Sequence, residues 1–218
     1  MTCRALMLLC LVAAAAPAAQ APSYPTDRVL THREQDPLIK RWILHRFDTV
    51  LPALMRREGI DMWVIVSREY NDDPVFRSMS PPTTFSSRRR TILVFSDPGA
   101  GKPVERLSIG RFDYDGLYAL LRTPNDGQWD GLRKLVEERQ PAIIGVNTSQ
   151  AWNHADGLTA TEKENLLAAL GPKYAARVKS AEMLAVGWLE TKLAAETERW
   201  SKVSALVARV LDAAGAKP

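Results

Sequence analysis

Apolar residues follow two spacings along the chain, and each spacing predicts a different kind of element. Between residues 38 and 54 they recur at the helical interval, directly after Asp36-Pro37. Aspartate is a favoured cap and proline a favoured first helical residue, so the pattern predicts a helix that starts there and ends at Gly59. Residues 62–66 form a continuous apolar run. A run of this length after a helix predicts a strand buried on both faces.

The same patterns extend over the rest of the chain. Strands are predicted at 91–95, 104–109, 142–146 and 176–178, with the first two joined as a hairpin, and helices at 126–136, 161–170, 183–193 and 196–214. Pro52 should kink the first helix because proline cannot donate to the preceding turn. Thr161 and Glu164 suggest a capping box, and Gly171-Pro172 a helix end. This order predicts an α/β fold in which helices flank a mixed sheet.

The connection at 68–89 is long and polar and contains three prolines. Connections of this length are unusual in a compact domain unless they are functional or partly ordered. Arg88, Arg89 and Arg90 lie at its end, directly before a predicted buried strand. Their planar guanidinium groups could bind a substrate carboxylate, or they could be a solvated rim.

The first 21 residues have the pattern of a secretory signal peptide. Arg4 supplies a positive start, an uncharged and mostly apolar stretch follows, and Ala16-Pro17-Ala18 fits the small-residue cleavage pattern. Ala19-Gln20-Ala21 also fits, but Pro22 would follow that cut. The apolar stretch is too short for a spanning helix. We therefore expect an exported protein without a membrane segment after cleavage; a buried N-terminal helix is the alternative.

Composition narrows the classes of function. The chain has 218 residues and a formal charge of +4, spread widely enough that we expect no nucleic-acid partner. Both cysteines, Cys3 and Cys10, lie in the predicted signal peptide, so the mature protein would contain none. The remaining length suffices for a core without disulfides.

The sequence contains no convincing catalytic set. Residues 99–102, Gly-Ala-Gly-Lys, lack the spacing of a phosphate-binding loop and suit a hairpin turn. His154 and Asp156 cannot complete a metal site, which needs three or four ligands, and a turn before the next helix explains them better. A self-sufficient hydrolase that uses His154 and Asp156 is therefore the weakest hypothesis.

Three stretches resemble the N-terminal domain of the creatinase, prolidase and aminopeptidase P family. They are Leu51 to Val66 (a helix, a glycine and a buried strand), Ala155-Asp156-Gly157-Leu158-Thr159, and Trp188 to Glu196. The last is similar to the family's connector to its catalytic domain. The resemblance implies a creatinase-like α/β domain at 22–190. Residues 191–218 would then be the connector and first helix of a catalytic domain that the sequence lacks.

The resemblance also implies a function for a complete parent protein. Such enzymes remove the amino acid before proline with two divalent metals, manganese, cobalt or zinc, held by two Asp, one His and two Glu. None of these five ligands can be placed here, so this segment would hold no metal and no catalytic residue. It would contribute homodimer contacts and a wall of the peptide channel.

Three residues are candidates for that channel wall. By approximate position, Phe85 and Arg88 match an aromatic residue and an arginine that reach the neighbouring active site in creatinase, and Tyr70 lies in the same connection. Residues 68–82 depart from the family's N-x-x-Y-x-T-G-F pattern, so the resemblance leaves the substrate class open. The alternative is a stand-alone exported binding module with a pocket near Tyr70, Phe85 and Arg88.

Overall fold

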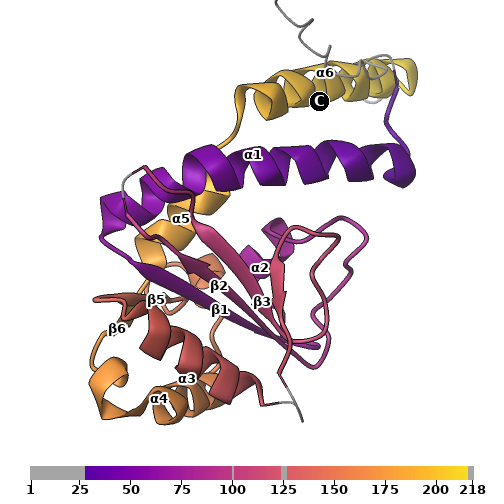
Figure 1. Ribbon diagram of the computed structural model, residues 1–218. Coiled ribbons are helices and arrows are strands. Elements are labelled where there is room, and N and C mark those ends of the chain that lie inside the picture. Colours follow the sequence, from indigo (N-terminus) through magenta and orange to yellow (C-terminus); the bar gives the residue numbers. More distant parts are fainter. Residues whose placement is uncertain (1–27, 100, 124–126, 216–218) are drawn as a thin grey trace, which may run out of the picture.

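The structure, a computed structural model, describes residues 28–99, 101–123 and 127–215 and contains a mixed sheet between two layers of helices (Figure 1). The order of the six described strands is β4-β3-β2-β1-β5-β6. Their bounds are β1 (Met62–Arg68), β2 (Arg90–Ser96), β3 (Glu105–Ile109), β4 (Ala119–Leu121), β5 (Ile144–Val146) and β6 (Val178–Ser180). Strand β2 is antiparallel to both of its neighbours, β1 and β3, and the other neighbouring pairs among these strands are parallel. The predicted fold class, a mixed sheet flanked by helices, is confirmed.

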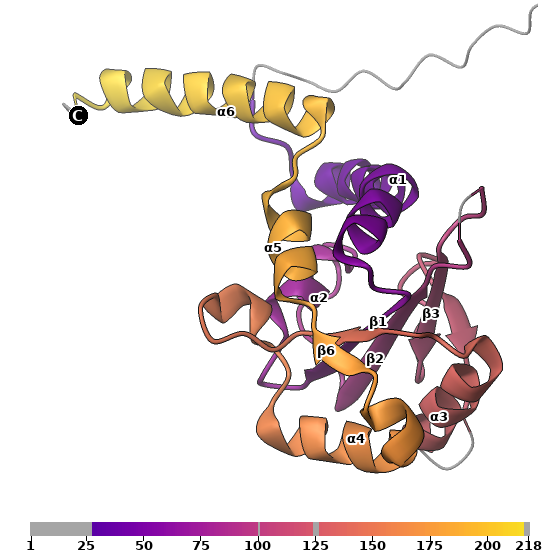
Figure 2. The same cartoon turned by 90° about the vertical axis from the view of Figure 1, so that its left-hand side faces the viewer.

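The helices cover both faces of this sheet. On one face lie α1 (His32–Glu58), the short α2 (Pro74–Ser78) and α5 (Glu182–Glu190), while α3 (Gln128–Arg139) and α4 (Ala160–Ala175) lie on the other (Figures 1 and 2). A short 3-10 turn, Asn153–Ala155, precedes α4. The last helix, α6 (Ala194–Ala213), lies over α1 on the side away from the sheet.

The central strand β1 is buried on both faces, as its apolar run predicted. Trp63 and Ile65 belong to the core between the sheet and the α1 and α5 layer. Met62, Val64 and Val66 point the other way, into the core shared with α3 and α4. None of these five side chains is more than 3% exposed. The period of two along a strand thus divides a single apolar run between two separate cores.

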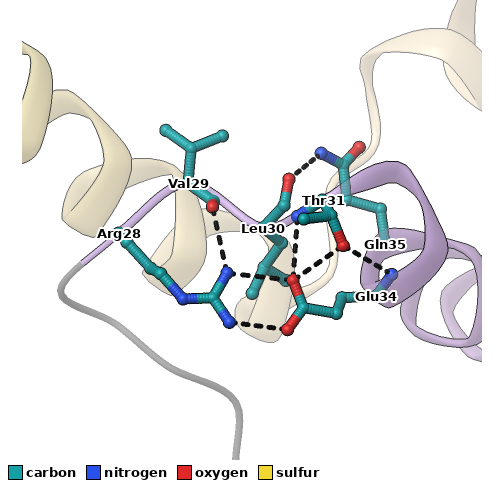
Figure 3. A network of polar contacts seen from close by, with 6 residues as sticks. All are labelled: Arg28, Val29, Leu30, Thr31, Glu34 and Gln35. Carbon is teal, nitrogen blue, oxygen red and sulfur yellow. Dashed lines mark hydrogen bonds and ion pairs between the residues drawn. The ribbon is translucent and has the colours of Figure 1, made fainter.

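Helix α1 begins at His32, so the predicted start at Asp36-Pro37 is wrong. Figure 3 shows the reason: Thr31 and Glu34 form a capping box, in which the Thr31 backbone N–H donates to Glu34 Oε2 at 2.9 Å and the Glu34 N–H donates to Thr31 Oγ1 at 3.4 Å. Arg28 also donates to Glu34, and this bond is the first cause of a Glu34 pKa lowered to about 2. The helix then continues through Pro37 and Pro52 to Gly59, the predicted end.

Helix α4 also starts earlier than predicted. Thr159, and not Thr161, is its cap, because the Thr159 hydroxyl accepts from the Glu162 N–H at 3.4 Å. Gly171 interrupts the helix with a φ of 66°, as its position before a proline suggested, yet a last helical turn continues to Ala175. This extension moves β6 two residues beyond its predicted place at 176–178.

Other boundaries differ less. The hairpin of β2 and β3 is confirmed, whereas β4 is a strand that the pattern did not predict. The predicted signal peptide at 1–21 and the predicted helix start at residue 126 lie outside the described residues. The long connection at 68–89 is partly ordered, because it contains α2.

A buried hydrogen-bond network holds this connection to the sheet. The Trp63 indole donates to Asn147 Oδ1 at 2.8 Å, and Asn147 Nδ2 donates to Asp73 Oδ2 at 2.9 Å. The other Asp73 oxygen accepts from the Val75 N–H at 2.8 Å and caps α2. Gly157 packs directly against this carboxyl, since a Cβ at that position would lie 2.1 Å from Asp73 Oδ2. The Ala155–Thr159 stretch is therefore fitted to Asp73 by close packing.

The network predicts a pH-dependent term in stability. Burial raises the pKa of Asp73 to about 6, from an ordinary value of 3.8. As the pH rises, the unfolded chain therefore loses the Asp73 proton before the folded protein does. The contribution of the protonated carboxyl to the unfolding free energy is complete below pH 4 and is lost as the pH rises through 6. We expect the unfolding free energy of Asp73→Asn, relative to the natural protein, to rise by about 2 kcal/mol between pH 4 and pH 7.

Denaturant unfolding over this pH range measures the difference. Asp48→Asn, the same change at a carboxylate with 65% side-chain exposure, is the matched control for the substitution itself. A constant difference between Asp73→Asn and the natural protein would contradict the assignment of the proton to Asp73.

Candidate functional site

A basic cleft of about 890 Å³ lies at one end of the sheet. Strands β1, β3 and β4 run in the same direction and end there, and the antiparallel β2 begins there. Six arginines line the cleft together with one carboxylate: Arg68, Arg88, Arg89, Arg90, Arg111 and Arg122, and Glu69. Basic side chains from separate parts of the chain thus meet on one surface.

A buried carboxylate anchors two of these arginines from below. Glu162, on α4, is 1% exposed, and its Oε2 lies 2.8 Å from Arg90 Nε while its Oε1 lies 3.3 Å from Arg68 Nη1. Both contacts are ion pairs without aligned hydrogen-bond geometry. The Arg90 guanidinium also lies 4.8 Å from the centre of the Trp129 ring. Two arginines share one carboxylate, so this group keeps a net positive charge toward the cleft.

Neutral hydrogen bonds fix the cleft wall between β2 and β3. The Gln128 amide donates to Arg90 O at 3.0 Å and to Ile109 O at 2.7 Å, and thereby joins the start of one strand to the end of the next. The Tyr114 hydroxyl lies 2.8 Å from Thr91 Oγ1. Burial raises the pKa of Tyr114, so this phenol remains neutral near pH 7. The wall beneath the arginines is therefore preorganised.

The backbone around the cleft adopts an uncommon conformation. Tyr70, Arg89 and Tyr114, which all line it, have φ values of 69°, 54° and 53°. Residues other than glycine rarely adopt positive φ, and such residues occur frequently at functional sites. Paired bonds hold one of these segments: the Glu69 N–H donates to Arg89 O at 2.8 Å, and the Arg89 N–H donates to Glu69 Oε2 at 3.2 Å.

Two of the three predicted site residues belong to this cleft. Tyr70 and Arg88 line it; the Tyr70 side chain is 97% exposed, and Arg88 lies 3.8 Å from Glu69. Phe85 is 82% exposed and is not among the lining residues that the structure describes. The structure therefore brings Tyr70 and Arg88 together but places Phe85 elsewhere on the surface. Their assignment to a substrate channel stays a prediction.

The sequence indicated Arg88, Arg89 and Arg90 but not the other three arginines of the cleft. Arg68 is the last residue of β1, Arg111 lies two residues beyond β3, and Arg122 directly follows β4. An arginine at the end of an apolar run, or within two residues of it, is the signal that could have identified them. Glu162 was overlooked because it lies within the first turn of a helix, where an acidic residue is ordinary.

The structure gives His154 and Asp156 a structural setting. His154 is exposed in the 3-10 turn, and Asp156 Oδ1 accepts from the Ser149 N–H at 3.0 Å. No group of three or more His, Cys, Asp and Glu residues that could hold a metal ion occurs within 28–99, 101–123 and 127–215. In the same part of the chain, no helix has both the length and the apolar character needed to cross a bilayer.

Comparisons with known proteins give a distant likeness. No family model matches the chain, and no curated protein matches it. Among solved structures, the chain is similar to an Xaa-Pro dipeptidase from Bacillus anthracis, with 16% identity and a TM-score of 0.41. The match covers 64% of this chain and 33% of the dipeptidase, so it spans about a third of that protein's length. The likeness is too distant to carry a functional assignment.

The ion pairs beneath the cleft predict the effect of removing the shared carboxylate. Glu162→Gln leaves Arg68 and Arg90 without their counter-charge, and we expect it to lower the unfolding free energy by about 2 kcal/mol. Half of the Arg68 side chain is exposed to water, and this exposure limits the decrease in unfolding free energy. Denaturant unfolding of the purified chain measures it.

Glu137→Gln is the matched control, because Glu137 pairs with Arg133 on the surface of α3 at 3.0 Å. Surface pairs contribute little, so this change should stay within about 0.5 kcal/mol. Equal effects of the two substitutions would show that Glu162 does not anchor the arginines.

Proposed function

We propose that this chain is the N-terminal, non-catalytic domain of an exported Xaa-Pro aminopeptidase-like metallopeptidase, and that a catalytic domain follows α6 in the complete protein. The three stretches that resemble the family support this proposal. The observation that carries it is the exposed apolar face of α6.

Helix α6 has an apolar stripe but buries none of its described residues. Trp200 is 75% exposed and Val210 is 60% exposed, and Val207 and Leu211 are each about half exposed. An amphipathic helix normally packs its apolar stripe against a core. A surface of this kind favours a role as a packing face for a second domain.

The connection to α6 is anchored at a defined point. Arg46, buried on α1, donates a hydrogen bond to the Trp188 carbonyl, and its guanidinium lies 4.1 Å from the centre of the Trp188 ring. Arg46 Nη1 also lies 3.9 Å from Glu196 Oε1, and Glu196 Oε2 accepts from the Leu193 N–H at 2.7 Å. These contacts hold the first turn of α6 to the domain. They suit a junction between two parts of one protein.

In this proposal the chemistry belongs to the second domain. Two divalent metals, manganese, cobalt or zinc, would be held there by two Asp, one His and two Glu, and would supply an activated water for peptide hydrolysis. The present domain would contribute contacts in a homodimer. It would also contribute Tyr70, Phe85 and Arg88 to a channel for the peptide substrate. Export rests on the signal-peptide pattern of residues 1–21.

A stand-alone exported binding module is the second candidate function. The arginine-lined cleft favours it, because this cleft is built from the described residues alone and needs no further domain. The two candidates differ in what α6 does.

The gene separates the two candidates directly. If the coding sequence beyond Pro218, in the same or a nearby shifted frame, continues for about another domain with two Asp, one His and two Glu in that order, the complete product should hydrolyse Xaa-Pro peptides with added metal. The 218-residue chain should not, and it should bind no stoichiometric manganese, cobalt or zinc. A stop codon with no such domain nearby, or a tightly bound metal equivalent, would exclude the peptidase proposal.

The apolar stripe gives a second prediction. Val210→Asp should change the unfolding free energy of the 218-residue chain by less than about 0.5 kcal/mol, because this side chain is 60% exposed to water. In the complete protein the same change should cost about 2 kcal/mol, since it would bury a charge in the packing face.

Ala205→Asp places the same charge on the opposite face of α6 and is the matched control for both proteins. Thermal or denaturant unfolding measures the changes. Similar effects of the two substitutions in the complete protein would show that α6 does not pack through this stripe.

A further inference from the structure

We propose that the arginine-lined cleft binds a small ligand that carries a polyphosphate group. This inference goes beyond the peptidase proposal and does not rest on it. Among the described residues that line the cleft, none belongs to α1, α5 or α6, so the junction and the cleft are separate parts of the domain.

Charge is the first argument. Six arginines and one glutamate line the cleft. Arg68 and Arg90 share the single negative charge of Glu162, and the exposed Arg122 forms no ion pair with a carboxylate of the described residues. A peptide offers only a single terminal carboxylate to such a cluster. A polyphosphate carries several negative charges on adjacent groups. Arginine binds phosphate oxygens through two parallel N–H donors, so the cluster is chemically suited to this ligand.

The second argument is the fixed position of the donors. Glu162 and Trp129 hold the Arg90 guanidinium, and Glu162 also holds Arg68. Two hydroxyls, of Thr91 and Ser108, complete the polar lining between these arginines. Preorganised donors lower the entropy cost of binding, which distinguishes this site from a mobile charged rim.

Size and aromatic rings are the third argument. The cleft volume, about 890 Å³, lies within the range of small-molecule sites. Tyr70 and Phe112 both line the cleft and are 97% and 48% exposed, so their rings are accessible for stacking. The polyphosphate group could therefore belong to an inorganic chain or to a nucleotide, whose base would stack on these rings.

Titration calorimetry of the 218-residue protein at constant ionic strength tests the proposal. The probes are tripolyphosphate, a nucleoside triphosphate and citrate, a tricarboxylate. We expect saturable binding of tripolyphosphate at one ligand per chain, and clearly weaker binding of citrate. A nucleoside triphosphate that binds more tightly than tripolyphosphate would support the site with a stacked base, and equal affinities would support a site for the polyphosphate alone.

Two variants locate the binding. Arg122→Gln should weaken tripolyphosphate binding about tenfold, as expected for one lost charge-assisted contact. Arg133→Gln, which removes the same charge from the outer surface of α3, should leave it unchanged. Circular dichroism shows that both variants fold. No saturable binding of tripolyphosphate, an equal loss in both variants, or citrate binding as tight as tripolyphosphate would each overturn the proposal. None of these results bears on α6, so the peptidase proposal is tested separately.

Discussion

Burial of β1 on both faces is the constraint on which the rest of the structure depends. The side chains of this strand alternate between the core under α1 and α5 and the core over α3 and α4. Its neighbour β2 is buried in the same way, with Leu93 and Phe95 on one side and Ile92 and Val94 on the other. A sheet held by two cores is rigid, and its strand ends therefore have defined positions. The cleft is built from those ends.

Two buried carboxylates show how the domain uses polar groups within this frame. Asp73 is satisfied by backbone N–H groups and the Asn147 amide, without a cation, so its burial raises the pKa. Glu162 forms ion pairs with two arginines. The first arrangement orders a long connection beside the sheet. The arrangement around Glu162 leaves positive charge at the surface. Asp73 therefore has a structural role, whereas the arginines at Glu162 are candidates for binding.

The domain also keeps its two exposed features apart. The arginine cleft is at the end of the sheet, whereas α6 is joined to α1 and α5 through Arg46 and lies over α1 (Figures 1 and 2). An apolar helix face suits packing against protein, and a basic cleft suits a charged small molecule. One molecule can therefore carry both proposed roles without competition between them.

The sequence by itself determined the α/β class, the two-faced burial of β1, the β2–β3 hairpin and the amphipathic character of α6, because each follows from a local period of apolar residues. It also indicated that the connection at 68–89 is unusual. Cap positions were less predictable, since Thr31 and Thr159 compete with equally plausible caps nearby. Only the tertiary structure decided that Arg68, Arg90, Arg111 and Arg122 line one cleft and that the first two share Glu162. Their proximity results from strand order and direction, which join residues far apart in the chain, and no local pattern encodes that order.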